Sequence, residues 1–123
     1  MSVVLLCDDL LFGSKVTTTG RAHGIPVTVA RTPTAAVAKA ADAACMIVDL
    51  HLDGLNLQAF LGELRASRQV RVIGFGSHVD VETLKAARRA GCDLVMPKSQ
   101  FTAELETKLK EWAATSASHP PQT

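Results

Sequence analysis

Short apolar runs alternate along the chain with longer segments of mixed polarity. Five runs rich in β-branched and other apolar residues predict strands at 2–7, 26–30, 44–49, 70–75 and 93–97. Val3–Leu6 and Met46–Val48 are apolar throughout, which is typical of parallel strands covered on both faces. The segments between the runs are long enough for crossover helices, which connect parallel strands. The pattern therefore predicts an α/β fold with a five-stranded, doubly wound parallel sheet.

The segments outside these runs have helical features. We expect five helices, at 11–23, 33–43, 57–65, 81–90 and 101–112. The last has one apolar stripe that runs from Phe101 to Trp112, with Thr102 as its expected N-cap. The fourth lies between Asp80, a candidate N-cap, and Gly91, a residue type common just beyond helix C-termini. The first contains poor helix formers, so we expect packing to hold it helical.

The composition fits one globular domain and no membrane or nucleic-acid protein. The chain has 123 residues, of which 47% are hydrophobic, and 13 basic residues balance 12 acidic ones. A net charge of +1 gives no sequence-wide field that attracts nucleic acid or an anionic membrane. The longest apolar runs are far shorter than the roughly 20 residues that span a bilayer. Three cysteines without a CxxC pair are typical of a reducing compartment, so we expect a cytoplasmic protein.

The composition changes near the C-terminus. Residues 115–123 are mainly Ala, Ser, Thr, Pro and other polar types, which cannot support a packed element. We therefore expect one domain over residues 1–114 and a disordered tail over 115–123.

Polar residues follow four of the five predicted strands. Asp8 and Asp9 follow the first, Asp49 closes the third, Ser77 follows the fourth and Lys98 follows the fifth. Because ligands of open parallel sheets bind beyond the carboxyl ends of the strands, these side chains mark a candidate site.

The residue types at this edge indicate phosphoryl chemistry. Three neighbouring carboxylates would repel one another unless a cation lay between them, and Mg²⁺ prefers such oxygen ligands while leaving positions for phosphate. A lysine opposite them would pair with the phosphate charge. The set suits transfer of a phosphoryl group onto a carboxylate.

These features resemble the receiver domain of two-component response regulators over about residues 2–112. The acidic pair, the lone Asp49, Lys98 and the spacing from Gly91 to Lys98 carry the resemblance. It implies the flavodoxin/CheY-like strand order 2-1-3-4-5. It also implies that Asp49 accepts the phosphoryl group and that Lys98 contacts the phosphoryl oxygens. Mg²⁺ would be held by Asp8, Asp9, Asp49 and the backbone carbonyl of His51, whose side chain we expect to face solvent.

Several positions depart from the receiver pattern. Gly76 stands where a Thr or Ser is usual, with Ser77 one residue later as a weaker candidate for phosphoryl contact. Leu57 stands where Gly is usual, and Val95 replaces the usual aromatic residue; the chain has no Tyr. Asp53 also stands where Pro is expected. These departures affect the groups that position a phosphoryl group and report its presence.

Two functions follow from the resemblance. The first is a stand-alone receiver, phosphorylated on Asp49 by a histidine kinase or phosphotransfer protein, that signals to an unidentified downstream protein. The alternative is a pseudo-receiver, a protein-interaction module independent of phosphorylation. A conventional enzyme is disfavoured, because the sequence has no phosphate-binding glycine loop and no nucleophile–histidine pair at a motif spacing.

Overall fold

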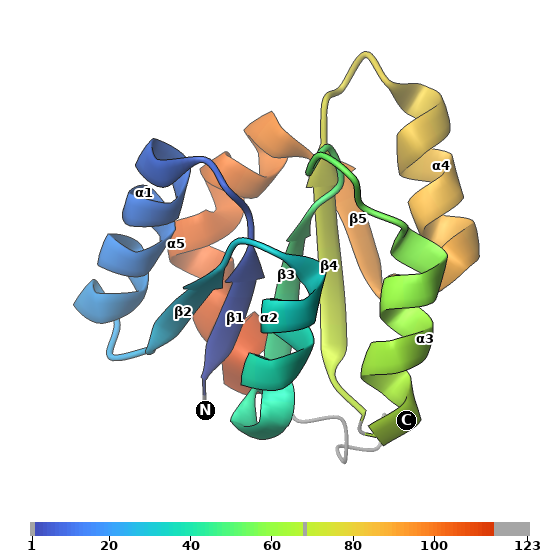
Figure 1. The fold of residues 1–123 in the computed structure, drawn as a ribbon. Coiled ribbons are helices and arrows are strands. Elements are labelled where there is room, and N and C mark those ends of the chain that lie inside the picture. The colour runs from blue at the N-terminus through green and yellow to red at the C-terminus, as the bar shows by residue number, and fades with distance from the viewer. Residues whose placement is uncertain (1, 68, 115–123) are drawn as a thin grey trace, which may run out of the picture.

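Five parallel strands form one sheet between two layers of helices (Figure 1). The computed structural model describes residues 2–67 and 69–114. The strand order is β2-β1-β3-β4-β5, which confirms the predicted doubly wound sheet. The strands are β1 (Val3–Leu6), β2 (Val27–Ala30), β3 (Cys45–Asp49), β4 (Arg71–Gly76) and β5 (Leu94–Pro97). Each overlaps a predicted strand, with ends that differ by at most one residue.

The helices cover the two faces of the sheet unequally. The elements are α1 (Leu10–Ala22), α2 (Pro33–Lys39) with a short 3₁₀ turn η1 (Ala40–Asp42), α3 (Leu57–Ser67), α4 (Val81–Ala90) and α5 (Lys98–Ala114). Buried residues of α1 and α5 pack with one set of strand side chains, and those of α2, α3 and α4 pack with the other set. The tail predicted for 115–123 lies outside the described residues. Within 2–67 and 69–114, no helix is both long and apolar enough to cross a bilayer.

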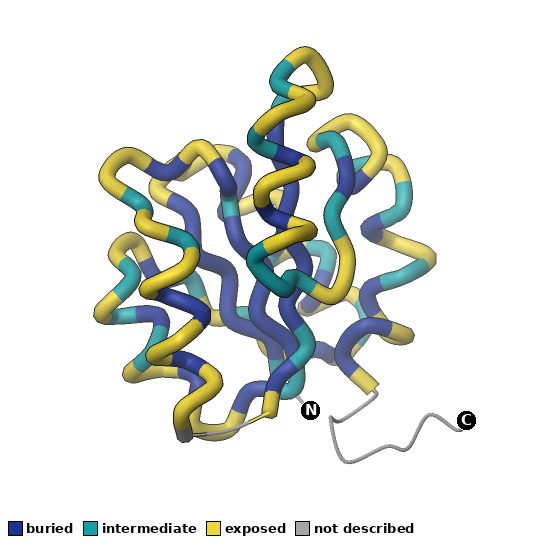
Figure 2. The backbone as a smooth tube through the Cα atoms, turned by 90° about the vertical axis from the view of Figure 1, so that its right-hand side faces the viewer, coloured by how far each residue is buried: buried dark blue, intermediate teal, exposed yellow. Residues whose placement is uncertain are grey.

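The central strands are buried on both faces (Figure 2). Val4 and Met46 point into the α2–α4 layer, whereas Leu5 and Ile47 point into the α1–α5 layer. All four are fully buried or nearly so. The apolar runs in the sequence therefore reflect two cores that share one sheet.

Helix ends follow capping rules at Thr32 and at the two predicted positions Asp80 and Gly91. Thr32 caps α2 through a hydrogen bond from the Ala35 backbone N–H, 3.1 Å long. Asp80 caps α4 in the same way, and Gly91 ends that helix with a φ of 111°.

The predicted start of the last helix was wrong. Helix α5 begins at Lys98, directly after β5, and Thr102 lies inside it rather than at its N-cap. The Thr102 hydroxyl donates to the carbonyl of Lys98, 2.9 Å away, which is a bond within the first turn. The first turn is polar, so it adds nothing to the apolar stripe that marked the helix in the sequence.

Helix α1 forms in spite of its glycines because it packs closely on β2. A methyl group at Gly20 would lie 2.6 Å from the Ile25 carbonyl oxygen and 2.6 Å from a methyl of Val27. Only a residue without a side chain allows this approach. The poor helix propensity of this segment is therefore offset by contact with the strand.

Gly20→Ala should destabilise the protein by about 1–3 kcal/mol, because the added methyl meets backbone as well as side-chain atoms. Gly62→Ala is the matched control: it lies in α3 with no atom within 4 Å of the added methyl, so it should stabilise by about 0.5–1 kcal/mol. Urea denaturation measures both changes. An unchanged midpoint for Gly20→Ala would contradict the close packing of α1 on β2.

Candidate functional site

The predicted site residues lie at the carboxyl-terminal edge of the sheet. The parallel register aligns the strand ends: Leu6 pairs with Val48, Asp49 with Phe75, and Gly76 with Pro97. The residues that follow these four strands therefore lie at the same edge of the sheet. The structure brings the predicted polar residues to one side of the molecule, as the crevice rule requires.

Lys98 is oriented by two contacts with the first strand–helix junction. Its Nζ lies 3.9 Å from Asp9 Oδ2 and 4.5 Å from the centroid of the Phe12 ring. Both charged side chains are about half exposed, so the ion pair contributes at most about 1 kcal/mol. The contacts set the direction of the ammonium group more than they stabilise the fold. Lys98 and Asp9 of the acidic pair therefore lie in contact.

Asp49 has one oxygen engaged by its own loop. Its Oδ1 accepts a hydrogen bond from the backbone N–H of His51, 2.9 Å long. Its Oδ2 lies 3.9 Å from the thiol of Cys7, a weak donor. Asp49 is partly exposed, so Oδ2 is the oxygen available to an incoming group.

The carboxylates supply the ligand chemistry of Mg²⁺ without forming a closed cluster. Asp9 Oδ1 accepts from the Phe12 backbone N–H, 3.0 Å away, as the N-cap of α1. Asp8 is exposed. Among the described residues, no group of three or more His, Cys, Asp or Glu could hold a metal ion. The oxygen donors fit the ion by type.

Cys7 is a site neighbour that the sequence analysis treated only as a core residue. Its thiol is buried and accepts from the Asp9 N–H at 3.4 Å. Its single proton has two acceptors within reach, Asp49 Oδ2 and the Asp9 carbonyl, each 3.9 Å from the sulfur. Burial is the main cause that raises the pKa of Cys7 above its ordinary value, and the charges of Asp49 and Asp9 add to it. Cys7 therefore stays a neutral thiol beside the candidate phosphoacceptor. Its position at the end of an apolar strand gave no signal of this contact.

The side chain of His51 is exposed, as predicted, but it is not free in solvent. Its Nε2 accepts a hydrogen bond of 2.9 Å from the backbone N–H of Ser77. A methyl group at Gly76 would lie 3.1 Å from the same Nε2. The imidazole therefore occupies the space beside the position where the receiver pattern has a hydroxyl residue. The Ser77 hydroxyl instead accepts from the Val79 N–H within its own loop, at 3.3 Å.

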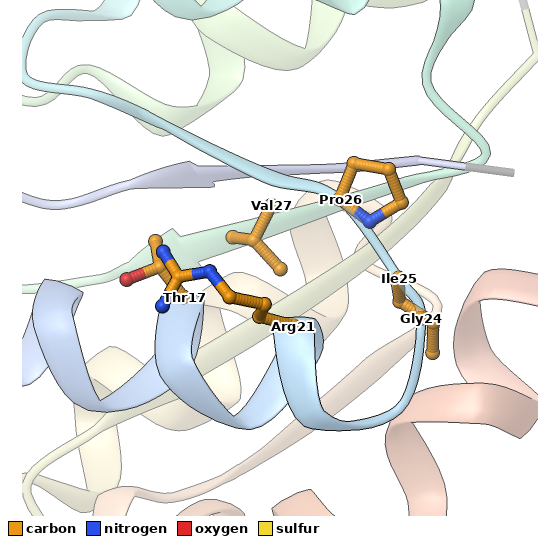
Figure 3. A pocket seen from close by; sticks show the side chains of 6 residues that line it. All are labelled: Thr17, Arg21, Gly24, Ile25, Pro26 and Val27. Atoms are coloured by element: carbon orange, nitrogen blue, oxygen red, sulfur yellow. The ribbon is translucent and has the colours of Figure 1, made fainter.

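Two hollows follow helix α1. One of about 250 Å³ touches Cys7 and Asp9 and continues past Ser14 to Arg31. The other, of about 300 Å³, lies farther along α1 at the turn into β2 (Figure 3). Thr17 lines both. The first hollow adjoins the candidate site, whereas the second lies toward the opposite edge of the sheet.

No sequence profile of a protein family matches the chain, and no curated protein matches it. Solved structures do match. A response regulator receiver domain from Bermanella marisrubri is 19% identical with a TM-score of 0.77, and the match covers 90% of this chain and 96% of that one. The receiver domain of a Pseudomonas aeruginosa sensor histidine kinase, with magnesium in its active-site cleft, is 22% identical with a TM-score of 0.75, over 93% and 98%. The receiver domain of a Saccharomyces cerevisiae response regulator, solved with a histidine phosphotransfer protein, is 18% identical with a TM-score of 0.79, over 95% and 91%.

These matches define the fold. The chain has the CheY-like fold of response regulator receiver domains, as the sequence resemblance implied.

The three free thiols should react in a fixed order. Burial raises the pKa of Cys92 to about 11 and that of Cys45 to about 12. Only Cys92 is partly exposed, so iodoacetamide should modify it first, slowly at neutral pH and faster as pH rises toward 11. Cys7 and Cys45 should react only after unfolding. Mass spectrometry of peptides from the alkylated native protein tests this order, and modification of Cys7 as fast as Cys92 would contradict the burial of its thiol.

Proposed function

We propose that this chain acts as a receiver that accepts a phosphoryl group on Asp49 with Mg²⁺ and signals through contacts with a partner protein. The observation that carries the proposal is the meeting of Asp9 with Lys98 at the sheet edge where Asp49 presents its Oδ2. The donor would be a phosphohistidine on a kinase or phosphotransfer protein. Such a reaction would take place in the cytoplasm.

The proposed step is a transfer between two side chains. Asp49 Oδ2 attacks phosphorus, an O–P bond forms, the P–N bond of the phosphohistidine breaks, and the departing imidazole takes up a proton. Lys98 would balance the charge of the phosphoryl oxygens. Asp8, Asp9, Asp49 and the carbonyl of His51 would hold Mg²⁺, which supplies further charge neutralisation when bound. Hydrolysis of the acyl phosphate would return Asp49 to its carboxylate.

A pseudo-receiver is a second candidate, and one observation favours it. The imidazole of His51 lies against Gly76 and holds the Ser77 amide, so both the hydroxyl side chain usual at residue 76 and a free amide at residue 77 are missing from this edge. Such groups would stabilise a bound phosphoryl group. A chain without them could bind its partner regardless of phosphorylation.

Incubation with acetyl phosphate and Mg²⁺ should add the mass of one phosphoryl group to the wild-type protein and none to Asp49→Asn. The amide of Asn has no carboxylate oxygen to attack phosphorus, so labelling should be lost while the fold remains. Intact-mass spectrometry measures labelling, and circular dichroism checks the fold.

Asp53→Asn is the matched control, because it changes an exposed carboxylate four residues farther along. It should label as the wild type does. Equal labelling of Asp49→Asn and wild type would exclude Asp49 as the acceptor. Absence of labelling in all three proteins would support the pseudo-receiver.

A further inference from the structure

His51 contacts two loops through two different groups. Its backbone N–H donates to Asp49 Oδ1, 2.9 Å away, and its Nε2 accepts from the Ser77 N–H, also 2.9 Å away. His51 belongs to the β3–α3 loop (residues 50–56), and Ser77 begins the β4–α4 loop (residues 77–80). One residue therefore joins the carboxylate of Asp49 to the start of the neighbouring loop.

Gly76 makes room for this contact. An added methyl at residue 76 would lie 3.1 Å from His51 Nε2, 3.3 Å from its Cδ2 and 3.4 Å from a methyl of Leu84 in α4. Gly76 is buried, so a larger side chain there would have to displace the imidazole or the helix. The absence of a side chain at residue 76 and the presence of His at residue 51 are thus complementary features of this chain.

The contact continues into helix α4. Asp80, the N-cap of α4, accepts hydrogen bonds from the Thr83 backbone N–H at 3.1 Å and from the Thr83 hydroxyl at 2.6 Å. The Ser77 carbonyl accepts from the Asp80 N–H at 3.1 Å. The loop that His51 holds is therefore tied by short hydrogen bonds to the first turn of α4.

Two large apolar side chains on this segment are exposed. Val79 is 75% exposed and Val81 is 50% exposed. A shift of the Ser77 amide would be passed to both, because Val79 lies two residues beyond it on the short loop and Val81 is the first residue of α4.

We propose that His51 is a positioning residue that couples the state of Asp49 to the β4–α4 loop through its imidazole. The imidazole lies beside Gly76, the position on β4 where the receiver pattern has a hydroxyl residue. A change at Asp49 alters the acceptor of the His51 N–H, moves the imidazole, and thereby alters the hold of Nε2 on the Ser77 amide. The proposal deepens the proposed function, since phosphorylation would be the natural change at Asp49.

The coupling can be tested in the full chain without any phosphoryl group. Asp49→Ala removes the acceptor of the His51 N–H and serves as the perturbation. It is introduced into the wild type, His51→Ala and His78→Ala, the last being a matched control that changes another exposed histidine on the β4–α4 loop. The measurement is the amide chemical-shift change that Asp49→Ala causes at Ser77, Val79 and Val81, recorded by ¹H–¹⁵N NMR.

In the wild type and in His78→Ala, Asp49→Ala should shift the amide signals of residues 77–81. In His51→Ala the changes at Val79 and Val81 should fall to the level of those at Thr28 on the far edge strand. Equal changes at Val79 and Val81 in all three backgrounds would overturn the proposal.

A second variant separates the hydrogen bond from packing. His51→Phe keeps a ring over Gly76 but has no nitrogen acceptor, so it should lose the coupling as His51→Ala does. Retained coupling in His51→Phe would contradict the role of Nε2.

Beryllofluoride with Mg²⁺ then serves as a phosphoryl mimic in the same proteins. If it shifts Val79 and Val81 in the wild type but not in His51→Ala, phosphoryl acceptance and coupling are both supported. If it shifts no amide in the wild type while Asp49→Ala still shows the dependence on His51, the receiver function fails and the coupling stands.

Discussion

Burial of the sheet on both faces is the constraint on which the rest of the structure depends. Strand residues such as Leu5 and Ile47 are fully buried, so polar side chains can stand at the end of a central strand but cannot lie in its buried part without loss of hydration. Parallel pairing then collects the strand ends at one edge. Asp49 and Lys98, which are far apart in sequence, share that edge because their strands run in the same direction. The candidate site is a geometric consequence of how the core is built.

The order and type of the elements could be predicted because each has a recognisable local sequence pattern. Apolar runs marked the five strands, and Asp80 and Gly91 marked the ends of α4 by capping chemistry. The start of α5 could not be found in this way, because its first turn from Lys98 is polar and continues no apolar stripe. The strand order depended on the resemblance to receivers, since periodicity describes each segment separately and does not say which strands pair.

The sequence indicated where the candidate site lies but not which side-chain contacts form there. The sequence indicated which residues share the sheet edge, yet it showed neither the Cys7 thiol beside Asp49 nor the imidazole of His51 against Gly76. Such contacts join segments that are distant along the chain, and side-chain direction after a strand depends on loop geometry. Taken alone, Gly76 lacks the hydroxyl side chain that the receiver pattern has at this position. Taken with His51, it leaves the space that the imidazole occupies, so the two residues complement each other.

The aromatic residues of the α1–α5 layer form a continuous series of rings. Phe12, Phe75 and Phe101 have centroids 5.0–5.9 Å apart, and Trp112 stacks on Phe101 at 5.5 Å. Trp112 is the only tryptophan in the chain, so intrinsic fluorescence reports on the surroundings of this layer. His51 and α4 lie across the sheet from it. Intrinsic fluorescence is thus an optical probe of one half of the molecule, and a chromophore on α4 would be needed to observe the other.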